Sequence, residues 1–141
     1  MLTANAMLQP VVALVLWSMV MWLWMYVTRI PAIQASRMKL DRELPNGQQM
    51  STLPARVRWK ADNYNHLMEQ PTIFYAAALV LAVVGDASQV SLGLAWAYVG
   101  FRVVHSVFQA TVNKIEVRFA IFALSSLVMA ALAVRAAMQV F

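Results

Sequence analysis

Four long apolar runs, separated by polar segments, set the pattern of this chain. A single polar side chain, Ser18, interrupts the first, and the runs cover residues 11–27, 67–84, 90–108 and 119–134. At a rise of about 1.5 Å per residue, each run with its flanking turns reaches across the ~30 Å core of a bilayer. The pattern predicts an all-α membrane protein, a four-transmembrane-helix bundle in one domain over 1–141, with helices at about 8–29, 63–84, 90–112 and 117–139.

Proline and glycine positions predict where these helices begin and end. Pro10 is expected at the start of the first helix, because a proline in the first turn removes no hydrogen bond that the helix needs. Arg29 and Pro31 are expected to close this helix, and Gly85 to end the second. The one long connection expected is residues 31–60.

Composition supports a lipid environment. Hydrophobic residues make up 62% of the chain and charged residues 12%, whereas a soluble domain carries about a quarter charged residues. The chain has no cysteine, which excludes disulfides and thiolate metal ligands. A basic stripe interleaved with exposed aromatics, typical of nucleic-acid binding, is missing, so the net charge of +5 indicates membrane topology instead.

Basic residues gather on one side of the predicted bundle. The loop between the first two helices and the connection between the last two hold Arg29, Arg37, Lys39, Arg42, Arg56, Arg58, Lys60, Lys114 and Arg118. Loops rich in Lys and Arg stay in the cytoplasm. We therefore expect a multi-pass protein of the cell (inner) membrane with both basic loops in the cytoplasm and both termini non-cytoplasmic. Arg135, on the opposite side, is expected to extend its long stem to the far interface.

The third predicted helix carries a polar stripe. Its members fall within an arc of about 80° at ~100° per residue, and they are Tyr98, Arg102, His105, Gln109, Asn113 and Glu116. Such a stripe must face protein or a water-filled cavity, because lipid cannot satisfy it. Two interpretations remain open: hydrogen bonds that join neighbouring helices, or a polar ligand site, with Glu69 as the expected partner of the buried cations.

The second predicted helix carries another polar face, formed by Asp62, His66 and Glu69. His66 and Glu69 are three residues apart, a spacing that could ligate a metal, but two ligands without a third are weak support, and no metal is expected. The sequence also has neither a Gly-rich phosphate loop nor a Ser-His-Asp ordering.

Several stretches resemble the MAPEG family, the membrane-associated proteins in eicosanoid and glutathione metabolism. Residues 63–75, NYNHLMEQPTIFY, resemble the helix-two signature of the family. Ala95-Trp-Ala-Tyr98, Arg102-Val-Val-His105, Asn113 and Arg118-Phe119 are similar to its third and fourth helices. The resemblance covers nearly the whole chain and is to a bacterial-type member. It implies a homotrimer, with glutathione held between neighbouring subunits near the cytoplasmic face.

The resemblance also implies roles for individual residues. The family places an Arg at the start of helix four beside the glutathione sulfur, and Arg118 matches it, where a guanidinium would stabilise the thiolate. Arg102 and His105 match the Arg-x-x-His pair, Gln109 a substrate-contacting position, and Arg37 a basic residue that closes the site. The implied glutathione-binding set is Arg37, Asn65, His66, Glu69, Arg102, His105, Gln109 and Asn113, with Arg118 as the catalytic residue.

The second helix departs from the family pattern. Glutathione-using members have an Arg and then an Asn before the helix-two Glu, whereas this chain has Asp62 and His66 there, with Asn65 one step away. A tripeptide with two carboxylates favours the fork of an Arg at such a position.

Three functions are therefore weighed. The first is a membrane-bound glutathione-dependent transferase or peroxidase that acts on lipophilic electrophiles dissolved in the bilayer. The alternative, favoured by the altered helix-two motif, is a non-catalytic MAPEG-like scaffold or binder of another small anionic or lipid-like ligand. A small channel or transporter is the third, disfavoured because the pattern predicts no helix broken by Gly or Pro in mid-span.

Overall fold

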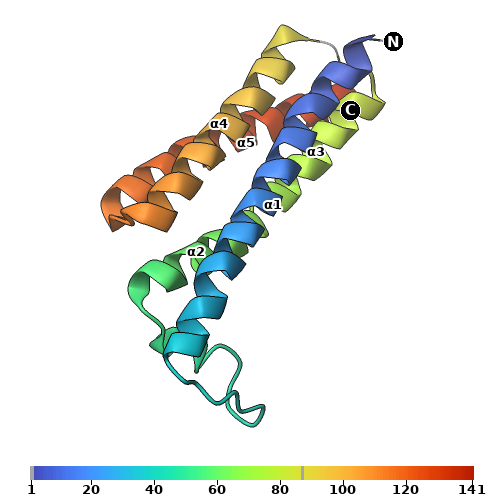
Figure 1. The fold of residues 1–141 in the computed structure, drawn as a ribbon. Coiled ribbons are helices and arrows are strands. Elements are labelled where there is room, and N and C mark those ends of the chain that lie inside the picture. The colour runs from blue at the N-terminus through green and yellow to red at the C-terminus, as the bar shows by residue number, and fades with distance from the viewer. Residues whose placement is uncertain (1, 87) are drawn as a thin grey trace.

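In the computed structural model, described for residues 2–86 and 88–141 and for side chains from residue 6 onward, the regular structure is helical. α1 (Leu2–Ala35) leads into a loop with one short 3₁₀ turn, η1 (Met50–Thr52). The remaining helices are α2 (Ala55–Leu67), α3 (Pro71–Val83), α4 (Gln89–Thr111) and α5 (Ile115–Val140) (Figure 1). The N and C labels lie at the same end of the bundle, called here the turn end, and the long loop lies at the other, the loop end.

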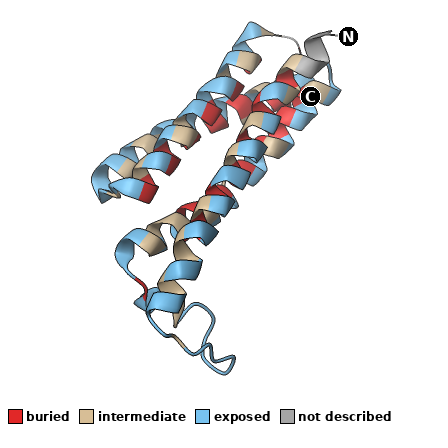
Figure 2. Ribbon diagram, viewed as in Figure 1, coloured by how far each residue is buried: buried red, intermediate tan, exposed pale blue. Residues whose placement is uncertain are grey.

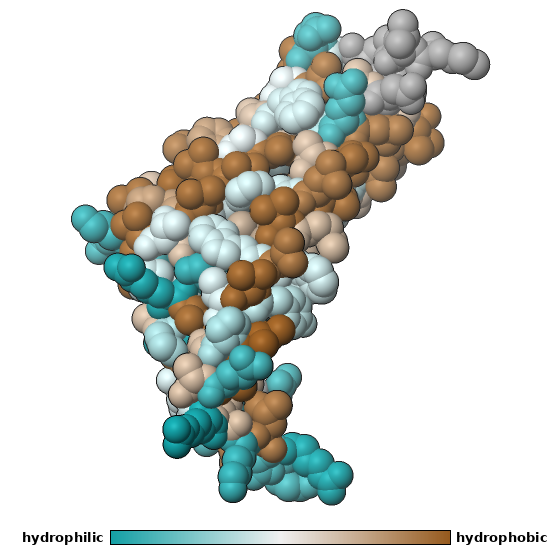
Figure 3. All heavy atoms as spheres, viewed as in Figure 1, coloured by the Kyte–Doolittle hydropathy of each residue, from teal (hydrophilic) through white to brown (hydrophobic). Residues whose placement is uncertain are grey.

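Four segments of the described chain are long and apolar enough to cross a membrane. They are Ala6–Ala35, Ala55–Val83, Gln89–Thr111 and Ile115–Val140. The outward faces of the helices are exposed (Figure 2), and the face of the molecule drawn in Figure 3 is largely apolar along the helices. Leu16 is 61% exposed and Leu127 is 69% exposed. Burying one such leucine in lipid stabilises it by roughly 1.5–3 kcal/mol. The predicted four-helix membrane bundle is confirmed.

The predicted ends of the first helix are wrong. Pro10 and Pro31 both lie inside α1, which continues to Ala35. Each proline removes one backbone hydrogen bond, but an interrupted helix in lipid would leave several more backbone groups without partners. The helix therefore continues through both prolines and ends beyond the second, where Arg37 takes a left-handed φ of 52°.

The second span begins earlier than predicted and is broken. Helix α2 starts at Ala55, and residues 68–70 separate it from α3, whose first residue, Pro71, has no N–H to continue the pattern. The carbonyl of His66 accepts from the Glu69 N–H at 3.3 Å within the break and also from Arg102 Nη2 at 3.1 Å. The expectation that no span is broken at a proline is therefore wrong. Irregular backbone is tolerated here because turn hydrogen bonds satisfy it: the Met68 N–H donates to Asn65 O at 2.9 Å and the Glu69 N–H to His66 O at 3.3 Å.

The core lies where α1, α3 and α4 meet and continues between α4 and α5 (Figure 2). Phe74 of α3 stacks on Tyr98 of α4, with ring centroids 4.7 Å apart. Other fully buried side chains include Leu14, Met21, Leu81 and Leu132. This packing holds the inner face of α4 against α2, α3 and α5.

A charged cluster closes the turn end. Arg135 of α5 donates to Ser91 Oγ at 3.2 Å and to Ser88 Oγ at 3.1 Å, and its Nη2 lies 3.5 Å from Asp86 Oδ2. The expectation that Arg135 extends to the lipid interface is replaced by this fixed contact. Burial raises the pKa of Asp86, but hydrogen bonds from Ser91 and Ser88 and the charge of Arg135 outweigh it and lower the pKa below its ordinary value.

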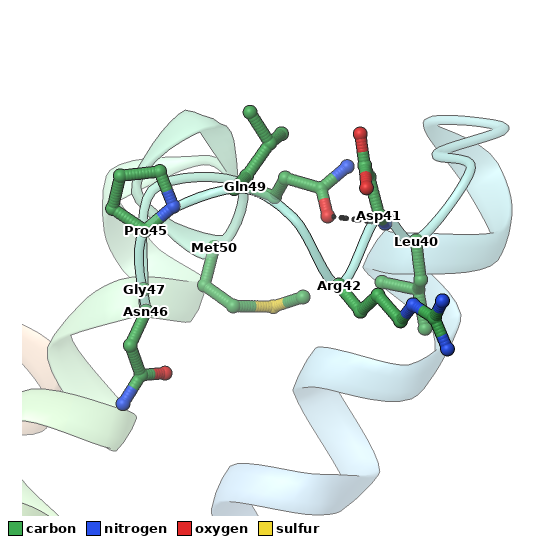
Figure 4. A pocket seen from close by; sticks show the side chains of 9 residues that line it. Leu40, Asp41, Arg42, Pro45, Asn46, Gly47, Gln49 and Met50 are labelled. Atoms are coloured by element: carbon green, nitrogen blue, oxygen red, sulfur yellow. Dashed lines mark hydrogen bonds between the residues drawn. The ribbon is translucent and has the colours of Figure 1, made fainter.

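The long loop folds on itself at the loop end. Gln49 joins its two sides, since its Nε2 donates to Lys39 O at 2.7 Å and its Oε1 accepts from the Asp41 N–H at 2.9 Å. The side chain of Met50 extends beneath the loop towards Arg42 (Figure 4). A hollow of about 590 Å³ lies there, and none of the residues predicted for the glutathione site lines it.

Candidate functional site

The polar stripe of α4 faces the interior of the bundle. Tyr98 and Arg102 are 0% exposed, His105 is 1% exposed and Gln109 is 5% exposed. Two expected members are not on this helix, because α4 ends at Thr111. Asn113 follows it with a left-handed φ of 55°, and Glu116 is an exposed residue of α5.

Arg102 is a buried cation with most of its donors unused. Its Nη2 bonds to the carbonyl of His66, so its charge lies at the C-terminus of α2, where the helix dipole favours a cation. Its Nε and Nη1 have no hydrogen-bond partner among the described residues. An unpaired buried charge costs several kcal/mol. Arg102 is therefore available to an anion.

The partner expected for Arg102 is engaged elsewhere. Glu69 Oε2 lies 2.9 Å from His66 Nδ1, and the Glu69 side chain is 67% exposed. Glu69 faces solvent because it lies in the break between α2 and α3, where the helical spacing assumed from the sequence does not hold. The prediction of a Glu69–Arg102 pair is wrong.

Further buried polar atoms without a partner surround Arg102. They are both ring nitrogens of His105, Oε1 of Gln109 and Nδ2 of Asn63. Native proteins leave only a few such atoms per hundred residues, and here they concentrate where α2 and α4 face each other. These groups can bind a ligand rich in donors and acceptors, or polar groups of a second subunit.

The rings of His66, His105 and Phe122 contact one another beside these buried polar groups. The ring of His66 lies 5.1 Å from that of His105 and 5.2 Å from that of Phe122, measured between centroids. The His66 side chain is 24% exposed, so it reaches from the buried cluster to the surface. Access to His105 and Arg102 from the loop end therefore passes His66.

Arg118 lies at the beginning of α5, beside this cluster. Its Nη1 donates to Asn113 Oδ1 at 2.7 Å, which ties the end of α4 to the start of α5. One turn later in α5, the ring of Phe122 contacts the rings of both His66 and His105. The remaining N–H groups of the Arg118 guanidinium and the N-terminal dipole of α5 both favour an anion at this point.

The structure brings most of the predicted site residues together. The group is named here the buried polar cluster after its buried members Arg102, His105 and Gln109. It also includes the partly exposed His66, Asn113 and Arg118 and the exposed Glu69. Two predicted residues lie outside it. Arg37 is exposed in the turn after α1, and Asn65 is exposed on a different face of α2.

Sequence reasoning missed two polar residues that join the helices around the cluster. Asn63 is fully buried, and its Oδ1 accepts from Ser106 Oγ at 2.9 Å. Gln70, in the break, accepts from Tyr98 OH at 3.2 Å and donates to Ser126 Oγ at 2.8 Å. The sequence carried a signal for both residues. Asn63, buried Leu67 and Gln70 follow one another at the spacing that places side chains on one helix face.

No group of three or more His, Asp or Glu side chains in the described part of the chain could hold a metal ion. The model of the MAPEG family matches residues 7–138, which include every residue of the buried polar cluster. No curated protein and no solved structure matches the chain.

Proposed function

The chain belongs to the MAPEG family, and from this premise we propose that it is a membrane-bound glutathione-dependent transferase or peroxidase acting on lipophilic electrophiles. The observation that carries the proposal is Arg102, a fully buried guanidinium with two unpaired donors. A buried cation without a counter-charge is retained at a cost, and binding a carboxylate would offset that cost.

The donors and acceptors of the buried polar cluster fit glutathione, a tripeptide with two carboxylates and a thiol. Nε and Nη1 of Arg102 lie on different edges of the guanidinium, and each can donate a hydrogen bond to an oxygen of the ligand. Gln109 and His105 offer groups for the peptide. Hydrogen bonds to charged groups contribute roughly 1.5–3 kcal/mol each, so a few of them are sufficient for specific binding.

Arg118 is the proposed catalytic residue. Its guanidinium is held by Asn113 at 2.7 Å, which fixes its position without neutralising its charge. A cation fixed beside a thiol favours the thiolate, which is the nucleophile. Conjugation then forms a bond from sulfur to the electrophilic carbon as the leaving group departs with its electron pair.

Ligand entry requires His66 to move. Its ring covers His105, and its pairing with Glu69 at 2.9 Å holds it at the surface. Rotation of His66 towards solvent would open the cluster from the loop end. We place the loop end on the cytoplasmic side of the cell (inner) membrane, because this end carries the basic loops and loops rich in Lys and Arg stay in the cytoplasm.

An apolar groove on α4 fits a lipophilic second substrate. It has a volume of about 330 Å³ and is lined by Val103, Val104, Val107, Phe108 and Thr111. The groove opens on the outer face of a membrane span, so a substrate dissolved in lipid reaches it without crossing water.

We further propose a homotrimer, in which a neighbouring subunit covers part of the exposed surface of α4.

A second function, a non-catalytic binder or scaffold, is favoured by the helix-two motif. Asp62, where the family has an Arg, is an exposed carboxylate on α2 and offers no donor to a carboxylate ligand. A protein that binds glutathione weakly, or that binds another small anion, is consistent with this substitution.

One experiment separates these functions. Purified protein in detergent is titrated with glutathione by calorimetry and assayed for conjugation with an aromatic halide. Binding with turnover supports the enzyme, whereas binding without turnover towards halides or lipid hydroperoxides supports the binder. No binding at millimolar glutathione would exclude both glutathione functions. Arg102→Met is the control that should abolish binding.

A further inference from the structure

A second polar hollow lies outside the buried polar cluster, at the loop end between α1, the long loop and α2. It has a volume of about 200 Å³ and is lined mainly by Arg29, Arg58, Asp62 and Asn65, with Gly47 and Ser51 of the loop. The glutathione-dependent enzyme proposed above does not use these residues, and none of them belongs to the buried polar cluster.

The charged groups of this hollow are not paired with one another or with other groups. Among the described residues, neither Arg29 nor Arg58 nor Asp62 forms an ion pair. Nε of Arg29 is buried and has no hydrogen-bond partner. Two guanidinium groups that share one hollow repel each other, and an anion between them would turn this repulsion into attraction.

The hollow lies beside a membrane-facing surface of α1. Trp22 is 38% exposed and Tyr26 is 41% exposed, and their rings contact edge to face at 5.2 Å. Arg29 follows on the same face of the helix, three residues after Tyr26. Exposed Trp and Tyr side chains are enriched at the headgroup level of a bilayer. A lipid whose chains lie along this face of α1 would place its headgroup at the hollow.

We propose that this hollow binds the headgroup of a membrane phospholipid that carries both a phosphate and a primary ammonium group, as phosphatidylethanolamine does. The guanidinium groups of Arg29 and Arg58 match the geometry of phosphate oxygens. Asp62 accepts the ammonium group. A volume of about 200 Å³ holds several waters and leaves room for a small headgroup of this kind.

Asp62 determines which headgroup fits. A headgroup with a phosphate and no cation leaves the carboxylate of Asp62 facing a negative ligand, which is unfavourable. A quaternary ammonium group carries no N–H to donate to that carboxylate. Asp62, which departs from the family pattern, thus has a proposed role at a second site that does not bind glutathione.

Lipid binding can be measured by native mass spectrometry on the full-length protein in detergent. The protein is titrated with phosphatidylethanolamine, phosphatidylcholine and phosphatidylglycerol of identical acyl chains. We expect the wild type to bind the ethanolamine lipid at least several-fold more tightly than the other two. Arg58→Gln should weaken it about tenfold, as expected for loss of a charged hydrogen bond to phosphate. Asp62→Asn should bring the ethanolamine-to-choline ratio close to one.

Matched controls remove the same charges outside the hollow. Arg56→Gln changes an exposed arginine of α2 two residues before Arg58, and Glu43→Gln changes an exposed loop carboxylate. Equal losses in Arg56→Gln and Arg58→Gln would overturn the proposal, because they would reflect net charge alone. An unchanged ratio in Asp62→Asn would also overturn it. Soluble phosphoethanolamine that binds as tightly as the lipid would exclude the lipid as the ligand.

Discussion

Replacing Arg102 by Met tests whether its buried guanidinium stabilises the fold or serves a ligand. The substitution keeps an unbranched side chain of similar length and removes the charge. It deletes one hydrogen bond to the His66 carbonyl, which is worth roughly 1.5–3 kcal/mol. It also removes two unpaired buried donors, each costing roughly 1–3 kcal/mol. The relieved cost, about 2–6 kcal/mol for both donors, equals or exceeds the lost bond, so we expect the free energy of unfolding to stay close to wild type or to rise by about 1–3 kcal/mol.

The same substitution at Arg135 is the matched control. The guanidinium of Arg135 bonds to Ser88 and Ser91 and lies 3.5 Å from Asp86, whose side chain is 4% exposed. Met at this position leaves a buried carboxylate without its cation. Breaking a fully buried pair costs about 3–5 kcal/mol, and the partial exposure of Arg135 reduces this to about 2–4 kcal/mol.

The assay is unfolding in mild detergent at pH 7, with and without glutathione. Arg135→Met should lower the midpoint strongly and keep the increase that glutathione produces, whereas Arg102→Met should leave the midpoint close to wild type or above it and lose that increase. A loss of stability in Arg102→Met as large as in Arg135→Met would refute the reasoning. Arg102 would then be a structural residue whose other donors are satisfied within the assembly.

Three further predictions concern catalysis, pH and topology. Arg118→Lys should reduce turnover by roughly 10²-fold and change glutathione affinity little, because a point charge replaces the planar fork, whereas an ordinary interface anchor would tolerate Lys. Since the pKa of Asp86 is lowered in the folded protein, its carboxylate stabilises the fold above about pH 4, and this contribution is lost as the pH falls further. Asp86→Asn should therefore lower stability at pH 7 and weaken its dependence on acid; an unchanged acid transition would contradict the assignment. Reporter fusions at Phe141 and near Asn46 should lie on opposite sides of the membrane, with Asn46 in the cytoplasm, and the same side for both would contradict four spans.

The spans could be predicted because lipid allows few alternatives. A run such as residues 11–27 has no other way to satisfy its backbone, so composition alone indicates a helix. The ends of α1 could not be predicted, because the preferences of Pro10 and Pro31 are derived from helices in water. In water a helix can end at a proline and expose its backbone, which a membrane does not permit.

The buried polar cluster could be predicted in part. Arg102, His105 and Gln109 stand out because polar groups on one face of an apolar helix are expensive in lipid. Their contacts were not predictable, because the break at residues 68–70 changes the direction in which Glu69 points and brings the carbonyl of His66 within reach of Arg102. Asn63 was missed because the polar face of this helix was assigned to Asp62, His66 and Glu69, whereas Asn63 shares the face of buried Leu67.

The break also explains why Arg102 has two roles, one in the fold and one in the proposed binding of a ligand. A continuous second span would satisfy the carbonyl of His66 by a regular helical bond and would carry Glu69 on a regular helical face. The break instead makes Arg102 a second donor to this carbonyl, while only one of the three nitrogens of Arg102 is used. Gln70, inside the break, bonds to α4 and α5 at once, so the irregular segment is fixed by side chains on both sides. The buried charge is thus held in place by the fold before any ligand arrives. A guanidinium that is already desolvated and oriented loses little freedom when it binds a carboxylate, which is the condition for tight binding of a small anion.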